Sequence, residues 1–220
     1  MKTKLLILIL CVFALNAMGQ NARKAVRPTK TYAASVSGNA DGHDYVDLGL
    51  SVKWATCNIG ANSISEFGSL YAFASSTTDE YDWENYPYED YKNYPGNLTL
   101  PPEHDTATQV WGKAWRTPTY KELLELKTKC KWFWATCGNV MGCKVIGPNG
   151  NCIFLPAAGS TAGDYNQPNV HGMYWSSTIM ISGPGANVGV NKRLYFRNGL
   201  VSLDYSHGPQ VSMSVRPVLK

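Results

Sequence analysis

The segment WRTPTYKELLELKTKC, residues 115–130, constrains the fold more than any other part of the chain. Thr119 is followed three residues later by Glu122, which is the spacing of a capping box, where side-chain and backbone groups of both residues satisfy each other at a helix start. Apolar residues then recur at the spacing of a single helix face, so that face is expected to be buried. The segment therefore predicts one main helix over residues 119–130.

Short apolar runs on both sides of this helix predict antiparallel strands. Hairpin signals occur in HDYVDLGLSVKW (43–54), CKVIGPNGNCIFLP (143–156) and RLYFRNGLVSLD (193–204), the last with Asn-Gly between two alternating runs. GMYWSST (172–178) reads as one more strand and VSMSVRPVL (211–219) as the closing strand. The pattern predicts an α+β fold of hairpins around one main helix.

The first residues have the pattern of a secretory signal. Two lysines precede an apolar run over residues 5–17, and Ala17-Met18-Gly19 offers small residues for cleavage. We predict a signal peptide over 1–19, a polar and basic flexible leader over 20–42, and one domain over 43–220. The run is too short for a transmembrane helix, and lipidation at Cys11 is the less favoured alternative. The expected location is extracytoplasmic: the periplasm, the outer surface or the medium.

The charge distribution argues against a nucleic-acid partner. The chain has 20 basic and 16 acidic residues, but six of the basic residues lie within residues 1–40, where there is no acid. The remainder has fourteen basic and sixteen acidic residues, a net charge of −2. A basic surface for nucleic acid is therefore not predicted.

Catalytic and metal-binding motifs are missing from the sequence. The four histidines are far apart, and no HExxH, GxSxG, P-loop or CxxC pattern occurs. Glu103 and Asp105 are interpreted as solvated acids. We therefore predict a protein that is not an enzyme, with no catalytic residue, no bound metal and no cofactor.

The segment 77–95, TTDEYDWENYPYEDYKNYP, combines acidic residues with aromatic rings and keeps neither helix nor strand periodicity. It is predicted to be a long surface loop. Tyrosine and tryptophan give a large contact area with little loss of rotamer freedom. The expected ligand-binding residues are Trp83, Tyr86, Tyr88 and Tyr91. The alternative is that the loop folds over the domain and buries about half of its rings.

Five blocks together resemble one family: VDLGLSVKWATCNIGA, WRTPTYKELLELKTKC, GPNGNCIFLPAAG, YWSST and SVRPV. They are similar to the Fibrobacter succinogenes major paralogous domain, from about residue 43 to 218. The resemblance implies a C-type-lectin-like fold, akin to the formylglycine-generating enzyme. It also implies a bacterial surface protein that binds a ligand through its loops.

The resemblance also directs attention to Gln167 and Asn169. The segment NQPN, residues 166–169, is similar to the loop that holds calcium and sugar hydroxyls in C-type lectins. Gln167 and Asn169 are therefore added to the predicted ligand-binding residues. The later Trp-Asn-Asp partner of that loop is missing, so calcium is not predicted, and an ordinary turn is the favoured interpretation.

The cysteines depart from the family pattern. Without Cys11 five remain: Cys57, Cys130, Cys137, Cys143 and Cys152. Cys143 and Cys152 stand where the family leads us to expect tyrosine and serine, on the two arms of one hairpin, and we predict a disulfide between them. Cys57 and Cys130 either pair or stay buried. The alternative is that all five thiols are reduced.

The predicted function is a secreted or cell-surface binding module for a carbohydrate or a surface protein, with adhesion as one form of such binding. The first alternative is a structural component of a bacterial envelope or fimbrial assembly. The second is a degenerate enzyme of the formylglycine-generating type. That chemistry needs a reactive cysteine pair near the closing strands, whereas the last cysteine of this chain is Cys152.

Overall fold

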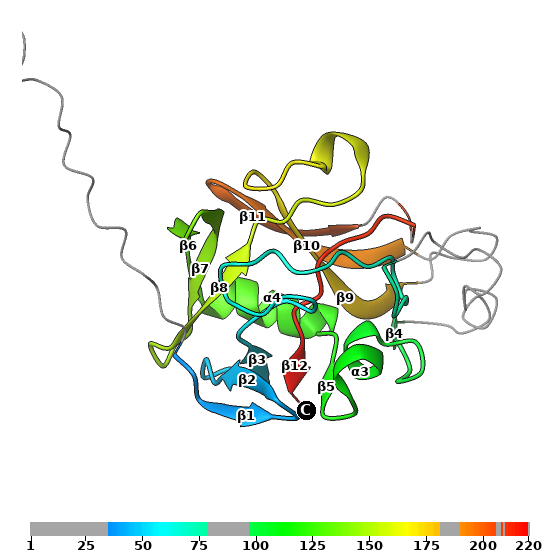
Figure 1. Cartoon of the computed structure of the whole chain (residues 1–220), viewed down its shortest axis with the longest axis horizontal. Helices are drawn as coiled ribbons and strands as arrows, with labels where there is room; N and C mark the ends of the chain where they lie inside the picture. The colour runs from blue at the N-terminus through cyan, green and yellow to red at the C-terminus, as the bar shows by residue number, and fades with distance from the viewer. Residues whose placement is uncertain (1–34, 79–96, 181–189, 206–207, 209, 220) are drawn as a thin grey trace, which may run out of the picture. The chain divides into compact units, whose positions relative to one another are not determined.

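The computed structural model describes residues 35–78, 97–180, 190–205, 208 and 210–219, and most of its regular structure is antiparallel strand. The strands form three sheets (Figure 1). One sheet has five strands in the order β1 (Gly38–Ala40), β2 (His43–Val46), β3 (Lys53–Ala55), β12 (Val218–Leu219) and β5 (Trp115–Arg116). The closing strand therefore lies between an early strand and the strand before the main helix.

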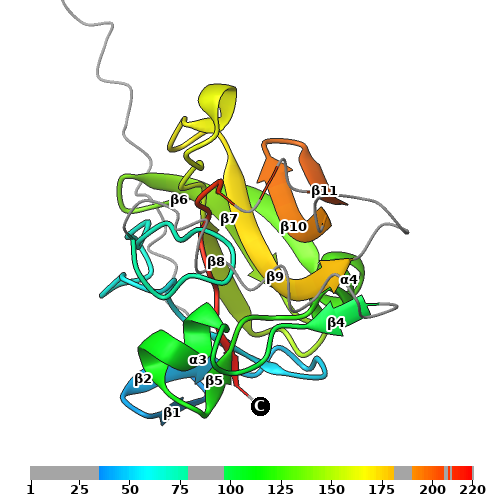
Figure 2. The ribbon, with the colours of Figure 1, turned by 90° about the vertical axis from the view of Figure 1, so that its right-hand side faces the viewer.

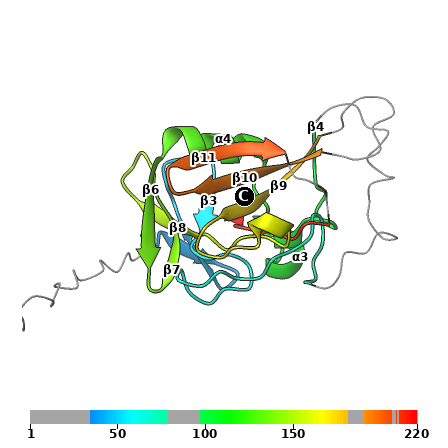
Figure 3. The ribbon, with the colours of Figure 1, turned by 90° about the horizontal axis from the view of Figure 1, so that it is seen from above.

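The other two sheets are antiparallel, and each contains three consecutive strands. The four-stranded sheet has the order β11 (Leu200–Tyr205), β10 (Val190–Arg197), β9 (Gly172–Met180) and β4 (Asn97–Thr99). The three-stranded sheet has the order β6 (Lys131–Cys137), β7 (Val140–Ile146) and β8 (Cys152–Pro156). Figure 3 shows β6 on the outer side of this sheet.

Helices are few. The main helix is α4 (Tyr120–Lys129), a second short helix is α3 (Thr106–Trp111), and one 3-10 turn, η1, covers Gly163–Tyr165. Helix α4 packs against β9, β10 and β11, and α3 lies beside β5 (Figure 2). The structure thus confirms mostly antiparallel strands with one main helix, as the α+β prediction requires.

Two buried clusters form the core. The first joins α4 to all three sheets, with Leu126, Trp54, Val145 and Phe196 among its buried residues. The second lies on the other face of β9 and β10, and Trp175 is buried in it. Burying these large apolar side chains supplies about 25 cal/mol for each Å² of surface removed from water.

The start of α4 is the predicted capping box. Thr119 accepts a hydrogen bond from the Glu122 N–H, and the Glu122 carboxylate accepts one from the Thr119 N–H at 2.8 Å. Arg116 also donates hydrogen bonds from both of its terminal nitrogens to the same carboxylate. The prediction of a capped helix is therefore confirmed, and Arg116 adds an ion pair to the cap.

Glu122 should make stability depend on pH. Burial raises the pKa of Glu122, but the hydrogen bond from Arg116 and the cap hydrogen bonds outweigh it and leave the pKa below its ordinary value. A carboxyl with a lowered folded-state pKa stabilises the fold above its unfolded pKa, and that stabilisation is lost as pH falls through the folded pKa. We expect Glu122→Gln to lower the free energy of unfolding by about 1 kcal/mol at neutral pH and the difference to vanish near pH 2. Urea unfolding across this range measures it, with Glu103→Gln as the control; a difference that persists in acid contradicts it.

The three hairpin predictions are confirmed, and β2 pairs antiparallel with β3, with Val46 opposite Trp54. Ile146 pairs with Cys152 across the β7–β8 turn, and Arg197 pairs with Leu200 across Asn198-Gly199. Gly199 has φ of +77°, a left-handed conformation that glycine adopts without strain. The closing strand is shorter than predicted, because regular pairing covers only the two residues of β12.

The predicted disulfide is wrong, because Cys143 and Cys152 are both free thiols in the structure. In the β7–β8 ladder Cys143 faces Leu155, whereas Cys152 faces Ile146. The two cysteines are therefore three pairs apart along the ladder and point to opposite faces of the sheet. A disulfide needs Cα atoms within about 7 Å, which this register does not allow. Cys57, Cys130 and Cys137 are free as well.

None of the helices in the described residues combines the length and the apolar character that crossing a bilayer requires.

Candidate functional site

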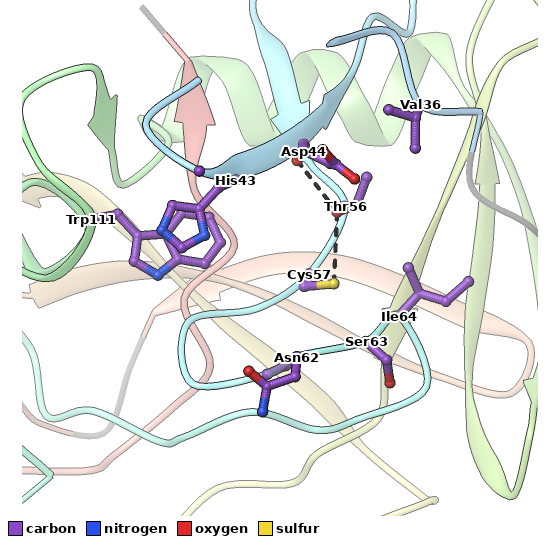
Figure 4. A pocket seen from close by; sticks show the side chains of 11 residues that line it. Val36, His43, Asp44, Thr56, Cys57, Asn62, Ser63, Ile64 and Trp111 are labelled. Atoms are coloured by element: carbon purple, nitrogen blue, oxygen red, sulfur yellow. Dashed lines mark hydrogen bonds between the residues drawn. The ribbon is translucent and has the colours of Figure 1, made fainter. Parts of the chain in front are cut away.

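A hollow of about 560 Å³ opens between three segments that are distant in the sequence. It is bordered by the start of β2, by the loop over residues 56–64 that follows β3, and by the end of α3. Figure 4 shows its side chains in two groups, with His43 and Trp111 on one side and Asp44, Thr56 and Cys57 on the other. We call this site the His43–Trp111 hollow.

The aromatic side of the hollow is a stack of two rings. The imidazole of His43 and the indole of Trp111 are parallel within 6°, with centroids 3.7 Å apart. The buried ring of Trp115 meets both edge-on and donates its indole N–H to the Ala40 carbonyl. Burial lowers the pKa of His43, and this outweighs the opposing effect of Asp41 and Asp44. The imidazole is therefore mainly neutral at pH 7, and the aromatic side carries no charge.

The polar side of the hollow offers groups of several kinds. Asp44 contributes a carboxylate, which accepts a hydrogen bond from the Asn39 amide at 2.8 Å. The hydroxyl of Thr56 lies 3.3 Å from the Asp44 carbonyl and 3.6 Å from the Cys57 sulfur. Exposed Asn62 adds an amide at the rim (Figure 4).

Arg216, which is only 1% exposed, supports the polar side of the hollow. Its Nη1 donates to the carbonyls of Ala55 and Thr56, at 2.9 and 2.5 Å. Its Nε donates to the Asn58 side chain at 2.8 Å. One side chain thus fixes the backbone that presents Thr56 and Cys57 to the hollow.

The aromatic side is positioned by Asp105. One carboxylate oxygen accepts from the Thr108 N–H at 2.9 Å, capping α3, and both oxygens accept from the Thr117 N–H. Asp105 is only 2% exposed, so its interpretation as a solvated acid is wrong. The carboxylate replaces hydrogen bonds to water with two hydrogen bonds from backbone N–H groups. It ties the helix that ends at Trp111 to the segment entering α4.

Of the predicted ligand-binding residues, only Gln167 and Asn169 lie in the part of the chain that the structure describes, and neither lines this hollow. Trp83, Tyr86, Tyr88 and Tyr91 are outside the described residues. Gln167 and Asn169 are exposed on the loop that precedes β9.

The Asn169 side chain already has a structural partner. Its Oδ1 accepts from the Met141 N–H at 2.8 Å, and the backbone N–H of Asn169 donates to the Ala157 carbonyl. With φ of +69°, Asn169 has the left-handed backbone typical of a turn. In the described ranges, no three His, Cys, Asp or Glu side chains gather as ligands for a metal ion.

Nothing in the sequence marked the hollow. His43 and Trp111 are 68 positions apart by their numbers, and neither belongs to a spaced motif. The pairings that link β2, β3, β12 and β5, together with the cap of α3, bring these residues together. No protein-family model, curated protein or solved structure matches this chain significantly. Its function must therefore be argued from its own geometry.

Proposed function

We propose that this protein is an extracytoplasmic binding module that holds a carbohydrate in the His43–Trp111 hollow. The observation that carries the proposal is the pairing of an uncharged aromatic stack with carboxylate, hydroxyl and amide groups around one opening. Ligand sites combine apolar and aromatic surface with a few polar groups, and their volumes run from about 300 to 1,000 Å³. Sugars present both C–H faces and hydroxyls, so such a lining suits them.

The proposal keeps the C-type-lectin-like fold that the five sequence blocks imply. The structure has mostly antiparallel sheets, one main helix and a closing strand that pairs with an early strand. These features are compatible with that fold. The apolar run and the small residues near position 19 support export. A surface protein is the alternative ligand, with the segment 77–95 as its contact.

A binding screen of residues 20–220 against a glycan array and a panel of surface proteins tests the proposal. We expect a glycan signal, and we expect Asn62→Ala to weaken it about tenfold or more, equivalent to about 1.4 kcal/mol. Asn62 is exposed, so its replacement leaves the core intact. Alanine at Trp83, Tyr86 and Tyr88 together is the comparison: loss of binding there but not with Asn62→Ala assigns the ligand to the loop instead.

Cys57 provides an independent readout of the same site. It is half-buried and borders the hollow, whereas half-buried Cys130 and Cys152 lie at the end of α4 and the start of β8. A glycan bound in the hollow should slow labelling of Cys57 by a bulky maleimide and leave the other two thiols unchanged. Equal protection of all three thiols, or of none, would argue against this location.

The envelope-component alternative has one observation in its favour, which is that no strand in the described part of the chain pairs with the outer edge of β6.

A further inference from the structure

Strand β6 is the outer strand of the three-stranded sheet. All seven of its residues pair with β7 on one side, from Lys131 with Ile146 to Cys137 with Val140. On its other side no strand pairs with it within the part of the chain that the structure describes. Figures 1 and 3 both place β6 at the margin of the folded elements. A row of backbone N–H and C=O groups therefore faces outward.

The other described edges are shorter, polar or covered. Strands β1, β4 and β5 have at most three residues each. Strand β11 has six residues and carries Asp204, which pairs with Arg193. The edge of β8 receives a hydrogen bond at Cys152 from the Ser35 N–H. β6 is thus the longest edge among these strands.

The β6 edge also lacks the residues that normally prevent edge pairing. Exposed edges are usually protected by charges, proline or bulges. In β6 the only charge is Lys131 at its first position, and no proline or bulge interrupts the ladder. Phe133 is 51% exposed on the outer face, while Trp132 and Trp134 pack against the first core cluster. An aromatic, uncharged edge of this length favours pairing over solvation.

The order of side chains on β6 favours a second copy of the same strand. In an antiparallel pair centred on Trp134, Lys131 faces Cys137 of the other copy, so the two lysines lie at opposite ends. Trp132 then faces Thr136 and Phe133 faces Ala135, so these two rings each meet a smaller side chain, and Trp134 faces Trp134 of the other copy on the core-facing side of the strand. A parallel pair would instead place the two lysines side by side. About a two-fold axis, each outward backbone N–H or C=O group can also form a hydrogen bond with the corresponding strand of the other copy.

We propose that this protein forms a homodimer in which β6 pairs antiparallel with β6 of a second copy about an axis near Trp134. The two three-stranded sheets then become one continuous sheet. The contact lies on a different element from β2, the 56–64 loop and α3, so it is independent of the His43–Trp111 hollow.

Sedimentation velocity of residues 20–220 over about 1–200 µM tests the proposal. We expect a concentration-dependent monomer–dimer equilibrium, and we expect Phe133→Glu to weaken dimerisation at least tenfold because it introduces a charge into the new ladder. Leu124→Glu on α4 (39% exposed) and Leu200→Glu on β11 (41% exposed) make the same change at similar exposure and should leave the dimer intact. Circular dichroism confirms that each variant is folded.

A double variant tests the antiparallel register. Combining Phe133→Glu with Ala135→Lys places each new carboxylate opposite a new ammonium group of the other copy, so dimerisation should recover relative to Phe133→Glu alone. A monomer at every concentration overturns the proposal, even if the chain co-purifies with another protein. A dimer that resists Phe133→Glu, or one that the controls disrupt equally, also overturns it.

Discussion

Arg216→Ala is expected to lower the free energy of unfolding by about 3–5 kcal/mol, because it leaves several buried oxygens without hydrogen-bond donors. The guanidinium is fully buried and its hydrogen bonds go to neutral oxygens: the carbonyls of Ala55, Thr56 and Phe154 and the amide of Asn58. Burial lowers the pKa of Arg216, against the opposing effect of Tyr174 and Cys57.

Removal of this side chain leaves several buried acceptors without donors, and each such group costs about 1–3 kcal/mol. The acceptors belong to β3, to the segment after it and to β8, so the loss also removes the link that Arg216 makes between the closing segment and two sheets. Because Ala55 and Thr56 lead into Cys57, the His43–Trp111 hollow should loosen before global unfolding. Faster maleimide labelling of Cys57 in the folded variant would report this.

Guanidinium chloride unfolding, followed by tryptophan fluorescence, measures the change. Arg197→Ala is the matched control, because Arg197 is exposed at the end of β10 and its loss should cost less than about 0.5 kcal/mol. Arg216→Lys should fall between the two, since one ammonium group cannot reach three segments at once. Equal stability of Arg216→Ala and the Arg197→Ala control would show that the buried network contributes nothing.

The blocks that resemble the family prove to be parts of the framework. In the GPNGN block, Asn149 and Asn151 both donate to the Asp47 carbonyl of the VDLGL block, at 2.8 Å each. A Cβ on Gly147 would lie 2.1 Å from the Leu48 carbonyl oxygen, so only glycine fits there. Arg216 of the SVRPV block holds the ATCN segment in the same way. The resemblance therefore describes how the sheets are joined, and it does not locate a ligand.

Local signals in the sequence predicted local structure well. The capping box at Thr119 and the Asn198-Gly199 turn each depend on residues within a few positions, and both are confirmed. Strand β6 was missed because it begins at Lys131, directly after the helix C-cap at Cys130, with no turn residue to separate them. Helix α3 was missed because its six residues are too few to show a periodic face.

Features that depend on strand register or on burial could not be predicted from local sequence signals. The Cys143–Cys152 prediction treated the two hairpin arms as facing, but the five residues of the turn set Ile146 against Cys152 and move Cys143 away from it. The hollow required three distant segments to meet, and no pattern in the sequence reports such a meeting. The burial of Asp105 could not be predicted for the same reason, because its partner Thr117 lies in a separate segment, between β5 and α4.

Asp105→Ala is expected to lower the free energy of unfolding by about 2–4 kcal/mol. Loss of an N-cap costs about 0.5–2 kcal/mol, and the second buried N–H, that of Thr117, loses its acceptor at about 1–3 kcal/mol. Asp105→Asn keeps one oxygen that can accept both N–H groups, as the existing bonds of Oδ1 at 2.9 and 3.0 Å indicate. We therefore expect the asparagine variant to lose less than half as much.

Glu103 supplies the matched control, because it lies two positions earlier in the same segment and is exposed. Glu103→Ala should change stability by less than about 0.5 kcal/mol. Since α3 carries Trp111 to its stack with His43, the Asp105→Ala variant should also bind glycan more weakly while still folded. If Asp105→Ala and Glu103→Ala unfold at the same denaturant concentration, the carboxylate does not hold α3. If Asp105→Ala is destabilised but binds glycan normally, the aromatic stack is not part of the ligand site.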